Sequence, residues 1–235
     1  KSLVTKLSSD ADLSQIGDLT GLEYQNTAII EGKPLGLITG LKVTGLIKNQ
    51  KELDDYKKQL GGYYNFFFQY LSIGDPMFQL DTAANSFGHY VAFNQVIGNA
   101  APKYYGGFTQ SLSYKNFDLS LYFTFSEGGQ LMWGDNVSSL TFVGTSNANA
   151  VMLNRWTPKN PNTAQPRLVW QDQALMYNTS LSVFNSSYLK LRTATLNYRF
   201  NKLDLMRRAG ISNVSIFASA TNIFTITKYP GNDPE

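Results

Sequence analysis

A period-two alternation of apolar and polar residues over 117–126 is the feature that most constrains the fold. The odd positions carry Phe, Leu, Leu, Phe and Phe, and the even positions carry Asp, Ser, Tyr, Thr and Ser. Ten residues in this pattern predict an extended strand with one apolar and one polar face. The preceding run, 108–114, alternates more weakly because Gln110 interrupts its apolar side. Since Lys115 and Asn116 separate the two runs, the sequence predicts an antiparallel hairpin.

Two more strands are expected near the end of the chain. Residues 194–200 alternate in the same way, but 189–191 alternates in the opposite phase. Such a phase change arises from a β-bulge or, in a membrane β-barrel, from a strand that extends beyond the bilayer. Residues 214–226 form another alternating run, although Phe217 and Ile223 fall on its polar side. The pattern therefore predicts a second strand pair with an irregularity.

The first part of the chain is less regular. Residues 35–46 predict a strand interrupted by glycines. Residues 50–60 predict a short amphipathic helix whose apolar side carries Leu53, Tyr56 and Leu60. A helical turn is also expected over 203–210, between the last two strands, with the glycine at its end as C-cap.

Two long segments, 61–105 and 128–186, are rich in Gly, Asn, Pro and aromatic residues and lack a regular pattern. Segments of this length count against an ordinary soluble domain but are typical of the extracellular loops of a membrane β-barrel. About six strands are expected, and an open six-stranded sheet cannot stand in lipid with unpaired edges. If the chain lies in a membrane, it must therefore be part of a larger barrel. A soluble all-β domain remains the alternative, because 16% charged and 14% aromatic residues suit both.

The residue inventory excludes several classes of chemistry. The chain has no cysteine, so it has no disulfide and no thiolate ligand or nucleophile. His89 is its only histidine. Asp54 and Asp55 are adjacent on the expected helix and do not face each other. The net charge is only +3, and no run of Lys or Arg indicates nucleic-acid binding. We therefore expect no catalytic residue, no metal site and no cofactor.

Seven segments, in order, resemble the C-terminal region of the SusC/RagA-type TonB-dependent outer-membrane transporters. They are EGKPLGLITGLKVTGL (31–46), QKELDDY (50–56), IGNAAPKYYGG (97–107), YKNFDLSL (114–121), NRWTPKNPNTAQPR (154–167), SYLKLRTATLNY (187–198) and NIFTITKYPGNDPE (222–235). Each segment alone is a weak signal. Their common order makes the resemblance specific.

The resemblance implies an all-β fold, namely the C-terminal strands of a transmembrane antiparallel β-barrel of about 22 strands with long extracellular loops and a plugged lumen. Residues 1–235 would form the C-terminal portion of that barrel, with the plug domain and the final strand outside this sequence. The implied function is TonB-dependent import of a nutrient, an oligosaccharide or a peptide, across the outer membrane of a Gram-negative bacterium. The implied partners are TonB, the lipid bilayer and a SusD-like surface lipoprotein. No enzymatic activity and no nucleic acid are implied.

Aromatic residues in the long segments are candidate contacts. Trp133 and Trp170 are candidates for binding the transported ligand, because aromatic faces stack well on sugars; packing within the loops is the alternative. For Trp156 in the RWTP segment, packing is the favoured interpretation. The aromatic run that includes Tyr63, Tyr64, Phe66 and Phe67 is a candidate contact for the lipoprotein partner, because exposed apolar patches often mark partner sites.

The segment 75–98 departs from the family pattern. The family often carries a Ca²⁺-loop-like motif here, but of that motif only Asp75, Asp81, Asn85 and Gly88 remain. Since Ca²⁺ takes six to eight oxygen ligands, a structured loop without metal is the expectation, and a bound Ca²⁺ is the alternative.

Three functions make different demands on these residues. In the transporter, Leu119, Leu121 and Phe123 would face lipid, while Ser120 and Thr124 would face the lumen. A soluble β-sandwich that binds glycans is the alternative, and it would fold alone in water. An outer-membrane enzyme barrel would require His, Ser and acidic residues together on lumenal positions, and the sequence has no such set.

Overall fold

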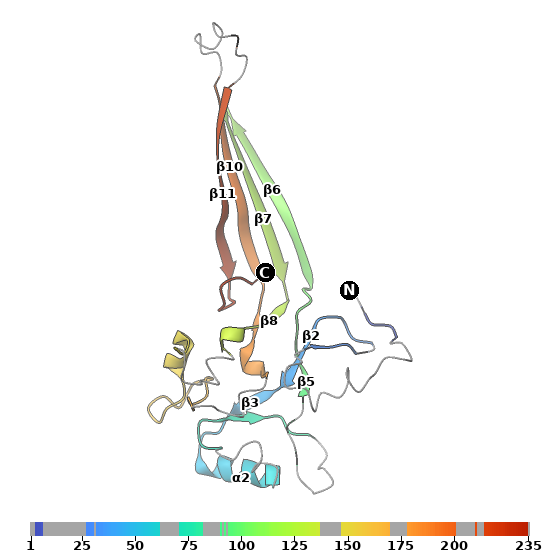
Figure 1. Ribbon diagram of the computed structural model, residues 1–235, viewed down its shortest axis with the longest axis vertical. Coiled ribbons are helices and arrows are strands. Elements are labelled where there is room, and N and C mark those ends of the chain that lie inside the picture. Colours follow the sequence, from blue (N-terminus) through green and yellow to red (C-terminus); the bar gives the residue numbers. More distant parts are fainter. Residues whose placement is uncertain are drawn as a thin grey trace. The chain divides into compact units, whose positions relative to one another are not determined.

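The computed structural model of the chain describes residues 3–6, 27–30, 32–61, 71–81, 90, 92, 94–136, 147–169, 178–200, 210 and 214–234. Two compact units are formed (Figure 1). Unit 1 comprises Lys1–Ala101 and Gln130–Phe184, and unit 2 comprises Pro102–Gly129 and Asn185–Glu235. In the described part of the chain, no helix has both the length and the apolar character needed to cross a membrane.

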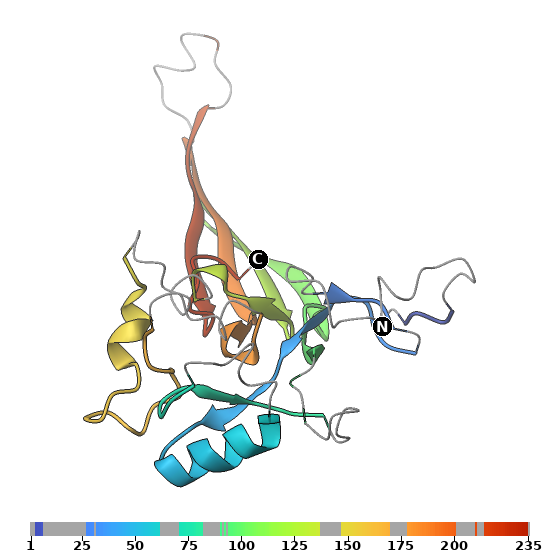
Figure 2. The same cartoon turned by 60° about the horizontal axis from the view of Figure 1, so that its bottom comes forward.

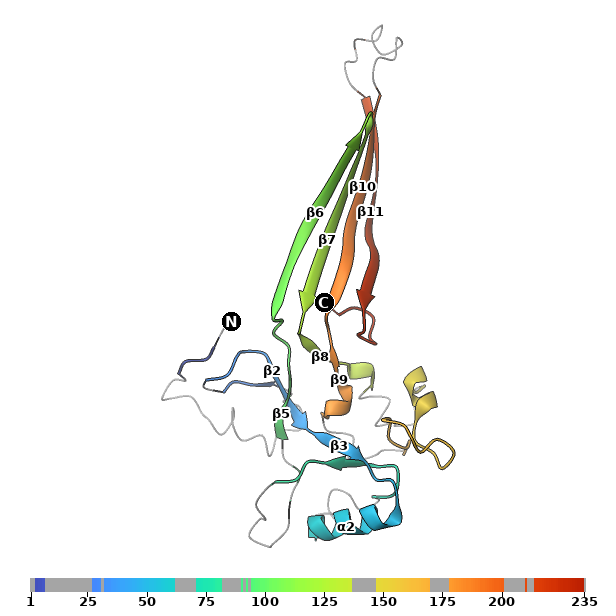
Figure 3. The same cartoon turned by 180° about the vertical axis from the view of Figure 1, so that it is seen from behind.

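Unit 2 is a four-stranded antiparallel sheet in the order β11-β10-β7-β6. The four long strands lie side by side in Figures 1 and 3. They are β6 (Tyr104–Tyr114), β7 (Phe117–Glu127), β10 (Tyr188–Phe200) and β11 (Val214–Thr227). Strands of this length match the roughly 9–11 residues that span a bilayer when tilted. The alternation in the sequence is therefore confirmed as strand structure.

The hairpin between β6 and β7 is confirmed as well. Lys115 and Asn116 form its two-residue turn, and Tyr114 lies directly opposite Phe117. Lys115 has φ of 52°, the left-handed conformation that two-residue hairpin turns require. A turn this short is typical of the periplasmic side of outer-membrane barrels.

Unit 1 combines short strands with the helix Gln50–Leu60 and a helical turn at 134–136. Its three-stranded sheet has the order β1-β2-β5, and β3 pairs with β4 and β8 with β9. The strands are β1 (Thr27–Ala28), β2 (Leu37–Leu41), β3 (Val43–Leu46), β4 (Pro76–Phe78), β5 (Asn94–Asn99), β8 (Gln130–Met132) and β9 (Val183–Asn185). Two 3-10 turns, Ala150–Asn154 and Ser180–Ser182, complete the described elements.

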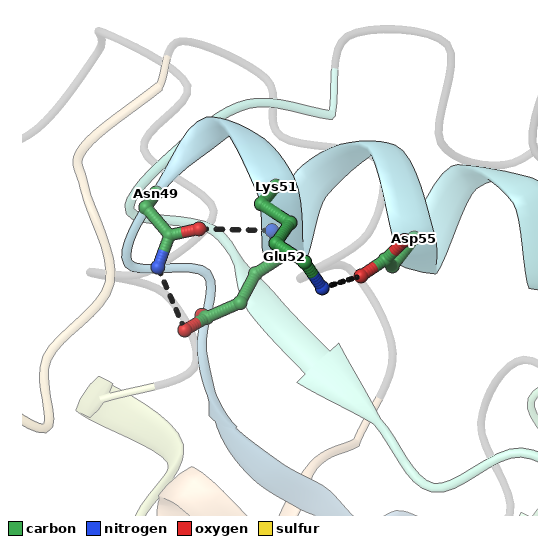
Figure 4. Close-up of polar contacts among 4 residues, drawn as sticks. All are labelled: Asn49, Lys51, Glu52 and Asp55. Carbon is green, nitrogen blue, oxygen red and sulfur yellow. Dashed lines mark hydrogen bonds and ion pairs between the residues drawn. The ribbon is translucent and has the colours of Figure 1, made fainter.

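Helix α2 (Gln50–Leu60) confirms the amphipathic helix, and its start is fixed by a capping box (Figure 4). The Asn49 side chain accepts a hydrogen bond of 2.9 Å from the Glu52 backbone N–H. The Glu52 carboxylate in turn accepts from the Asn49 amide and from the Lys48 N–H, each at 2.9 Å. The helix ends at Gly61, which has φ of 54°. The first of these bonds satisfies one of the backbone donors that a helix start leaves free, and the other two hold the Glu52 side chain over the N-terminus.

The core of unit 1 lies between α2 and the β3–β4 pair, which run alongside each other in Figures 1 and 2. Leu53, Tyr56 and Leu60 are buried, as their helical spacing predicts. The Tyr56 hydroxyl accepts a hydrogen bond of 2.9 Å from the Phe78 N–H and thereby joins the helix to β4. Burial raises the pKa of the Tyr56 hydroxyl to about 12.

Two expectations about unit 1 are wrong. Residues 35–46 do not form one strand but two, β2 and β3, which belong to different sheets and are separated at Lys42. The count of about six strands is too low, because the described residues contain eleven. The additional short strands lie in the segments that appeared irregular, since two to six residues are too few to show periodicity. The helical turn expected over 203–210 lies outside the described residues, apart from Gly210, whose φ is 73°.

Candidate membrane wall

The strand register of unit 2 separates apolar from polar side chains across the whole sheet. Residues directly opposite each other on antiparallel strands point to the same face, so Phe108, Phe123 and Leu191 share a face. The apolar face comprises Phe108, Leu112 and Tyr114 on β6, Phe117, Leu119, Leu121, Phe123 and Phe125 on β7, Leu189, Leu191, Ala194, Leu196, Tyr198 and Phe200 on β10, and Val214, Ile216, Ala218, Ala220, Phe224 and Ile226 on β11. Gln110 is its one polar member on β6 between Phe108 and Leu112.

A bulge keeps this face continuous where the sequence changes phase. Against β7, the register of β10 shifts between Leu191 and Thr193, which leaves Arg192 as an extra residue. Strand β11 shifts at the same level, where Asn222 has φ of 52°. Asn tolerates this left-handed conformation better than most residues. The phase change predicted from the sequence is therefore a β-bulge, and it turns Leu189 and Leu191 onto the same face as Ala194 and Leu196.

Much of the apolar face is exposed, although Leu191 is only 7% exposed. Leu112, Phe117 and Ile216 expose 55%, 47% and 62% of their surface. Among the described residues of unit 2, no second sheet packs on it, as a β-sandwich would require. An apolar face of this extent indicates contact with lipid or with another protein.

Aromatic residues flank the apolar face at both ends. Near the hairpin turn, Phe117 and Tyr198 are in contact, with ring centroids 4.7 Å apart. Toward the other end, Phe108 stacks on Phe123 at 4.8 Å. The stretch from Phe117 to Phe125 spans roughly 26 Å at about 3.3 Å per residue, comparable with the apolar band of about 25 Å in outer-membrane barrels, which is also bounded by aromatic girdles. The distribution therefore favours a lipid-facing surface.

The opposite face carries mostly hydroxyl and amide groups. Its members are Thr109, Ser111 and Ser113 on β6, Asp118, Ser120, Tyr122, Thr124 and Ser126 on β7, Lys190, Thr193, Thr195, Asn197 and Arg199 on β10, and Ser215, Phe217, Ser219, Thr221 and Thr225 on β11. The hydroxyls of Thr195 and Ser219 lie 3.0 Å apart. Such a face is suited to water.

The charged residues of this polar face are paired. Near the hairpin turn, Asp118 accepts hydrogen bonds from the Ser113 hydroxyl at 2.7 Å and from the Arg199 guanidinium at 2.9 Å. At the other end, the Lys190 ammonium lies 2.8 Å from the Asp233 carboxylate. Sequence analysis missed both pairs, because their members are 81 and 43 residues apart.

The aromatic candidates from the sequence are distributed differently. Trp133 is 7% exposed, and its ring meets Phe184 edge to face at 5.8 Å. This position agrees with the packing alternative, and its role in binding ligand stays a prediction. Trp170 lies outside the described residues, as do the candidate partner contacts Tyr63, Tyr64, Phe66 and Phe67.

The RWTP segment makes structural contacts in unit 1, and the position of Trp156 agrees with the favoured packing interpretation. The Trp156 ring lies so close to Gly74 that a Cβ on Gly74 would be 2.3 Å from it. Gly74 also has φ of 94°, which favours glycine. The segment ends at Arg167, whose guanidinium donates two hydrogen bonds to the Asp75 carboxylate, one of them from Nη2 at 2.9 Å.

Asp75 is therefore engaged in an ion pair. Its side chain is 6% exposed and also accepts a hydrogen bond of 2.7 Å from the Ser72 N–H. Burial raises the pKa of the Asp75 carboxyl, while Arg167 acts in the opposite direction. Among the described residues, no group of three or more His, Cys, Asp or Glu side chains lies close enough to hold a metal ion. Asn85 and Gly88 lie outside those residues, so the Ca²⁺ alternative stays untested.

Relatives of the chain are TonB-dependent receptors. It is 34% identical to TonB-dependent receptor P3 of Formosa agariphila over 145 residues, which is 61% of this chain and 14% of that protein. It is 28% identical to TonB-dependent receptor P26 of the same organism over 215 residues, which is 89% of this chain and 20% of that protein. No family model matches the chain.

The fold is also similar to that of a solved peptide transporter. The solved structure of the RagAB peptide transporter matches 91% of this chain with a TM-score of 0.64 and 21% identity. A structure of the RagAB peptide importer in its open-open state matches with a TM-score of 0.63. The expected resemblance to the SusC/RagA-type TonB-dependent transporters is thus confirmed in both sequence and fold. The fold class expected from the sequence, C-terminal strands of an antiparallel barrel, is confirmed by this likeness. The chain spans only 22% of the RagAB chain that it matches, so it represents about a fifth of such a transporter.

Proposed function

We propose that the protein imports a nutrient, an oligosaccharide or a peptide, across the outer membrane of a Gram-negative bacterium in a TonB-dependent manner. The observation that carries the proposal is the two-faced sheet of unit 2. Its strands are 11 to 14 residues long, one face is apolar and largely exposed, and the other is polar. The related receptors from Formosa agariphila and the fold of the RagAB peptide transporter support it.

In this proposal the chain carries no catalytic chemistry. The apolar face contacts lipid, and the polar face lines the aqueous interior of the barrel. Import is driven by TonB through parts of the transporter outside this chain. A SusD-like surface lipoprotein is the proposed partner, as the resemblance to the SusC/RagA-type transporters implies.

The aromatic candidates are proposed to contact the cargo or the lipoprotein. Trp133 and Trp170 are proposed to contact the cargo, and Tyr63, Tyr64, Phe66 and Phe67 the lipoprotein. For Trp133 a cargo role requires its ring, which is 7% exposed, to become uncovered. Replacing it by Ala would therefore lower stability as well as uptake, whereas Trp170→Ala is expected to lower uptake alone.

The experiment that tests the function begins with the complete transporter in its own bacterium. A tagged copy is purified from outer membranes in mild detergent, and the proteins bound to it are identified by mass spectrometry. Uptake of labelled oligosaccharide and peptide mixtures is then compared between cells with and without TonB. Copurification of a surface lipoprotein and TonB-dependent uptake of one mixture are expected. Recovery as a soluble protein without a lipoprotein would favour the glycan-binding module instead.

A further inference from the structure

The segment after β11 folds back onto the polar face of unit 2. Residues 228–234 follow the end of β11, beside the C label in Figure 1. Asp233 in this segment lies 2.8 Å from the Lys190 ammonium on β10. Lys190 belongs to the polar face, because it lies directly opposite Thr124 on β7 and Thr225 on β11. The segment therefore meets the sheet on the side opposite its apolar face.

The contact covers Lys190 but leaves the Asp233 side chain 52% exposed. The Lys190 side chain is only 5% exposed, although Thr225 beside it on the same face is exposed. The hydroxyl oxygen of Thr124 is fully covered, and Pro234 next to Asp233 is buried. A buried ammonium is costly without a charged partner, so the Asp233 carboxylate helps to stabilise the covered position of Lys190.

The segment is also held at its base and within itself. The Thr227 hydroxyl donates a hydrogen bond of 2.8 Å to the Ser187 carbonyl and accepts one of 3.0 Å from the Tyr229 N–H. The Tyr229 ring packs so closely on Gly231 that a Cβ there would lie 2.4 Å from it. Residues 228–234 are thus held to the sheet at two points, Tyr229 to Thr227 and Asp233 to Lys190, and are packed internally by Tyr229 on Gly231.

We propose that residues 228–234 form a strap, latched by Asp233 to Lys190, that closes the polar face of the barrel wall at the end of the sheet away from the hairpin turn. The inference rests on the proposed function in one respect, namely that the polar face lines the aqueous interior. If so, the strap narrows the aqueous interior where it crosses the polar face. Loss of the Asp233–Lys190 ion pair would then expose Lys190 and Thr124 to water.

A single-cysteine experiment tests the strap on the purified, complete transporter. The 235 residues contain no cysteine, so Thr124→Cys introduces one covered thiol into this part of the protein, and Thr225→Cys introduces an exposed control; any cysteines elsewhere in the transporter are replaced first. Reaction with a bulky, water-soluble maleimide is then followed with and without Asp233→Ala. Asp233→Ala is expected to speed labelling at position 124 by about tenfold or more, because losing a charge-assisted hydrogen bond shifts an opening equilibrium by at least that factor. Labelling at 225 should stay fast in both.

Equal labelling rates at position 124 with and without Asp233→Ala would overturn the strap. Hydrogen–deuterium exchange in 228–234, compared between the unmodified protein and Asp233→Asn, provides a second measurement if the cysteine variant fails to assemble. Faster exchange is expected in Asp233→Asn, and unchanged exchange would again overturn the proposal. The same labelling on intact cells separates the strap from the proposed function. If Asp233→Ala speeds labelling at position 124 in the purified protein but not on cells, the strap stands. The proposal that the polar face lines an aqueous interior open to the outside would then be contradicted.

Discussion

Leu191 on β10 lies directly opposite Phe123 on β7, although counting alternate residues back from Ala194 would turn Leu191 to the other face. The extra residue Arg192 causes the difference, and β11 adjusts at Asn222. The wall consequently has one continuous apolar face, built from strands whose sequences are out of phase. This geometry leads directly to two predictions about assembly.

Arginine on the apolar face should hinder assembly of the transporter. Leu121 lies in the middle of that face, between Gln110 on β6 and Ala194 on β10. Leu121→Arg is expected to cost about 2–4 kcal/mol, the penalty for arginine on the lipid face near the bilayer midplane. The amount of folded protein in the outer membrane should fall strongly. Ser120→Arg, one residue away on the polar face, is the matched control, and equal losses for both variants would contradict the assigned faces.

Deletion of Arg192 should be far more damaging than its replacement. Without the extra residue, one part of β10 must turn its apolar side chains to the polar face, since a shift by one residue exchanges the faces. Heat-modifiable migration of the outer-membrane protein on gels measures the folded fraction. We expect almost none for the deletion and a near-normal fraction for Arg192→Ala. A deletion variant that folds normally would show that the bulge is dispensable.

The ion pair between Asp75 and Arg167 should stabilise unit 1 strongly. Arg167→Ala leaves the Asp75 carboxylate, 6% exposed, without its charged partner, and breaking a buried pair in this way costs about 3–5 kcal/mol. Native-state proteolysis of the complete transporter should cleave unit 1 much faster. Lys51→Ala breaks the Lys51–Asp55 pair, whose side chains are 87% and 57% exposed, and should leave cleavage unchanged. Similar rates for the two variants would contradict the importance of burial.

The packing of helix α2 should weaken at high pH. The pKa of Tyr56 is about 12, against 10.0 for an ordinary tyrosine, so the folded state favours the neutral hydroxyl. Its stabilising contribution is complete below about pH 10 and is lost as the pH rises from 10 to 12, by about 3 kcal/mol in all. Proteolytic cleavage near α2 should therefore accelerate over that window. Tyr56→Phe should be less stable at pH 7, because the Phe78 N–H loses its acceptor, but should lack the additional loss above pH 10.

The long strands and the helix could be predicted from the sequence because their periodicity extends over ten or more residues. The alternation over 117–126 defined β7 and its faces, and the spacing of Leu53, Tyr56 and Leu60 defined the buried side of α2. Lys115 and Asn116 were identified as the turn because they separate two alternating runs. Local patterns were sufficient for each of these elements.

The contacts between distant segments could not be predicted in the same way. Asp75 and Arg167 are 92 residues apart, and nothing near either residue indicates the other. The division of 35–46 into β2 and β3 also depends on partners, β5 and β4, that are too short to be recognised. The phase change in the sequence indicated the bulge in β10. In β11 the matching irregularity was indicated only by Asn222, a residue that tolerates positive φ. These features depend on which distant segments pair with each other, and a single sequence does not show that pairing.

The most direct test of the central claim, that unit 2 is a membrane wall with one lipid-facing side, is a spin-label scan over 117–126 in the complete transporter. Each residue is replaced in turn by a spin-labelled cysteine, the protein is placed in lipid bilayers, and collision with oxygen is compared with collision with a water-soluble nickel complex. The account predicts a period of two, with oxygen contact dominant at 119, 121 and 123 and nickel contact dominant at 120 and 124. An absence of alternation, or nickel contact at 119, 121 and 123, would contradict it.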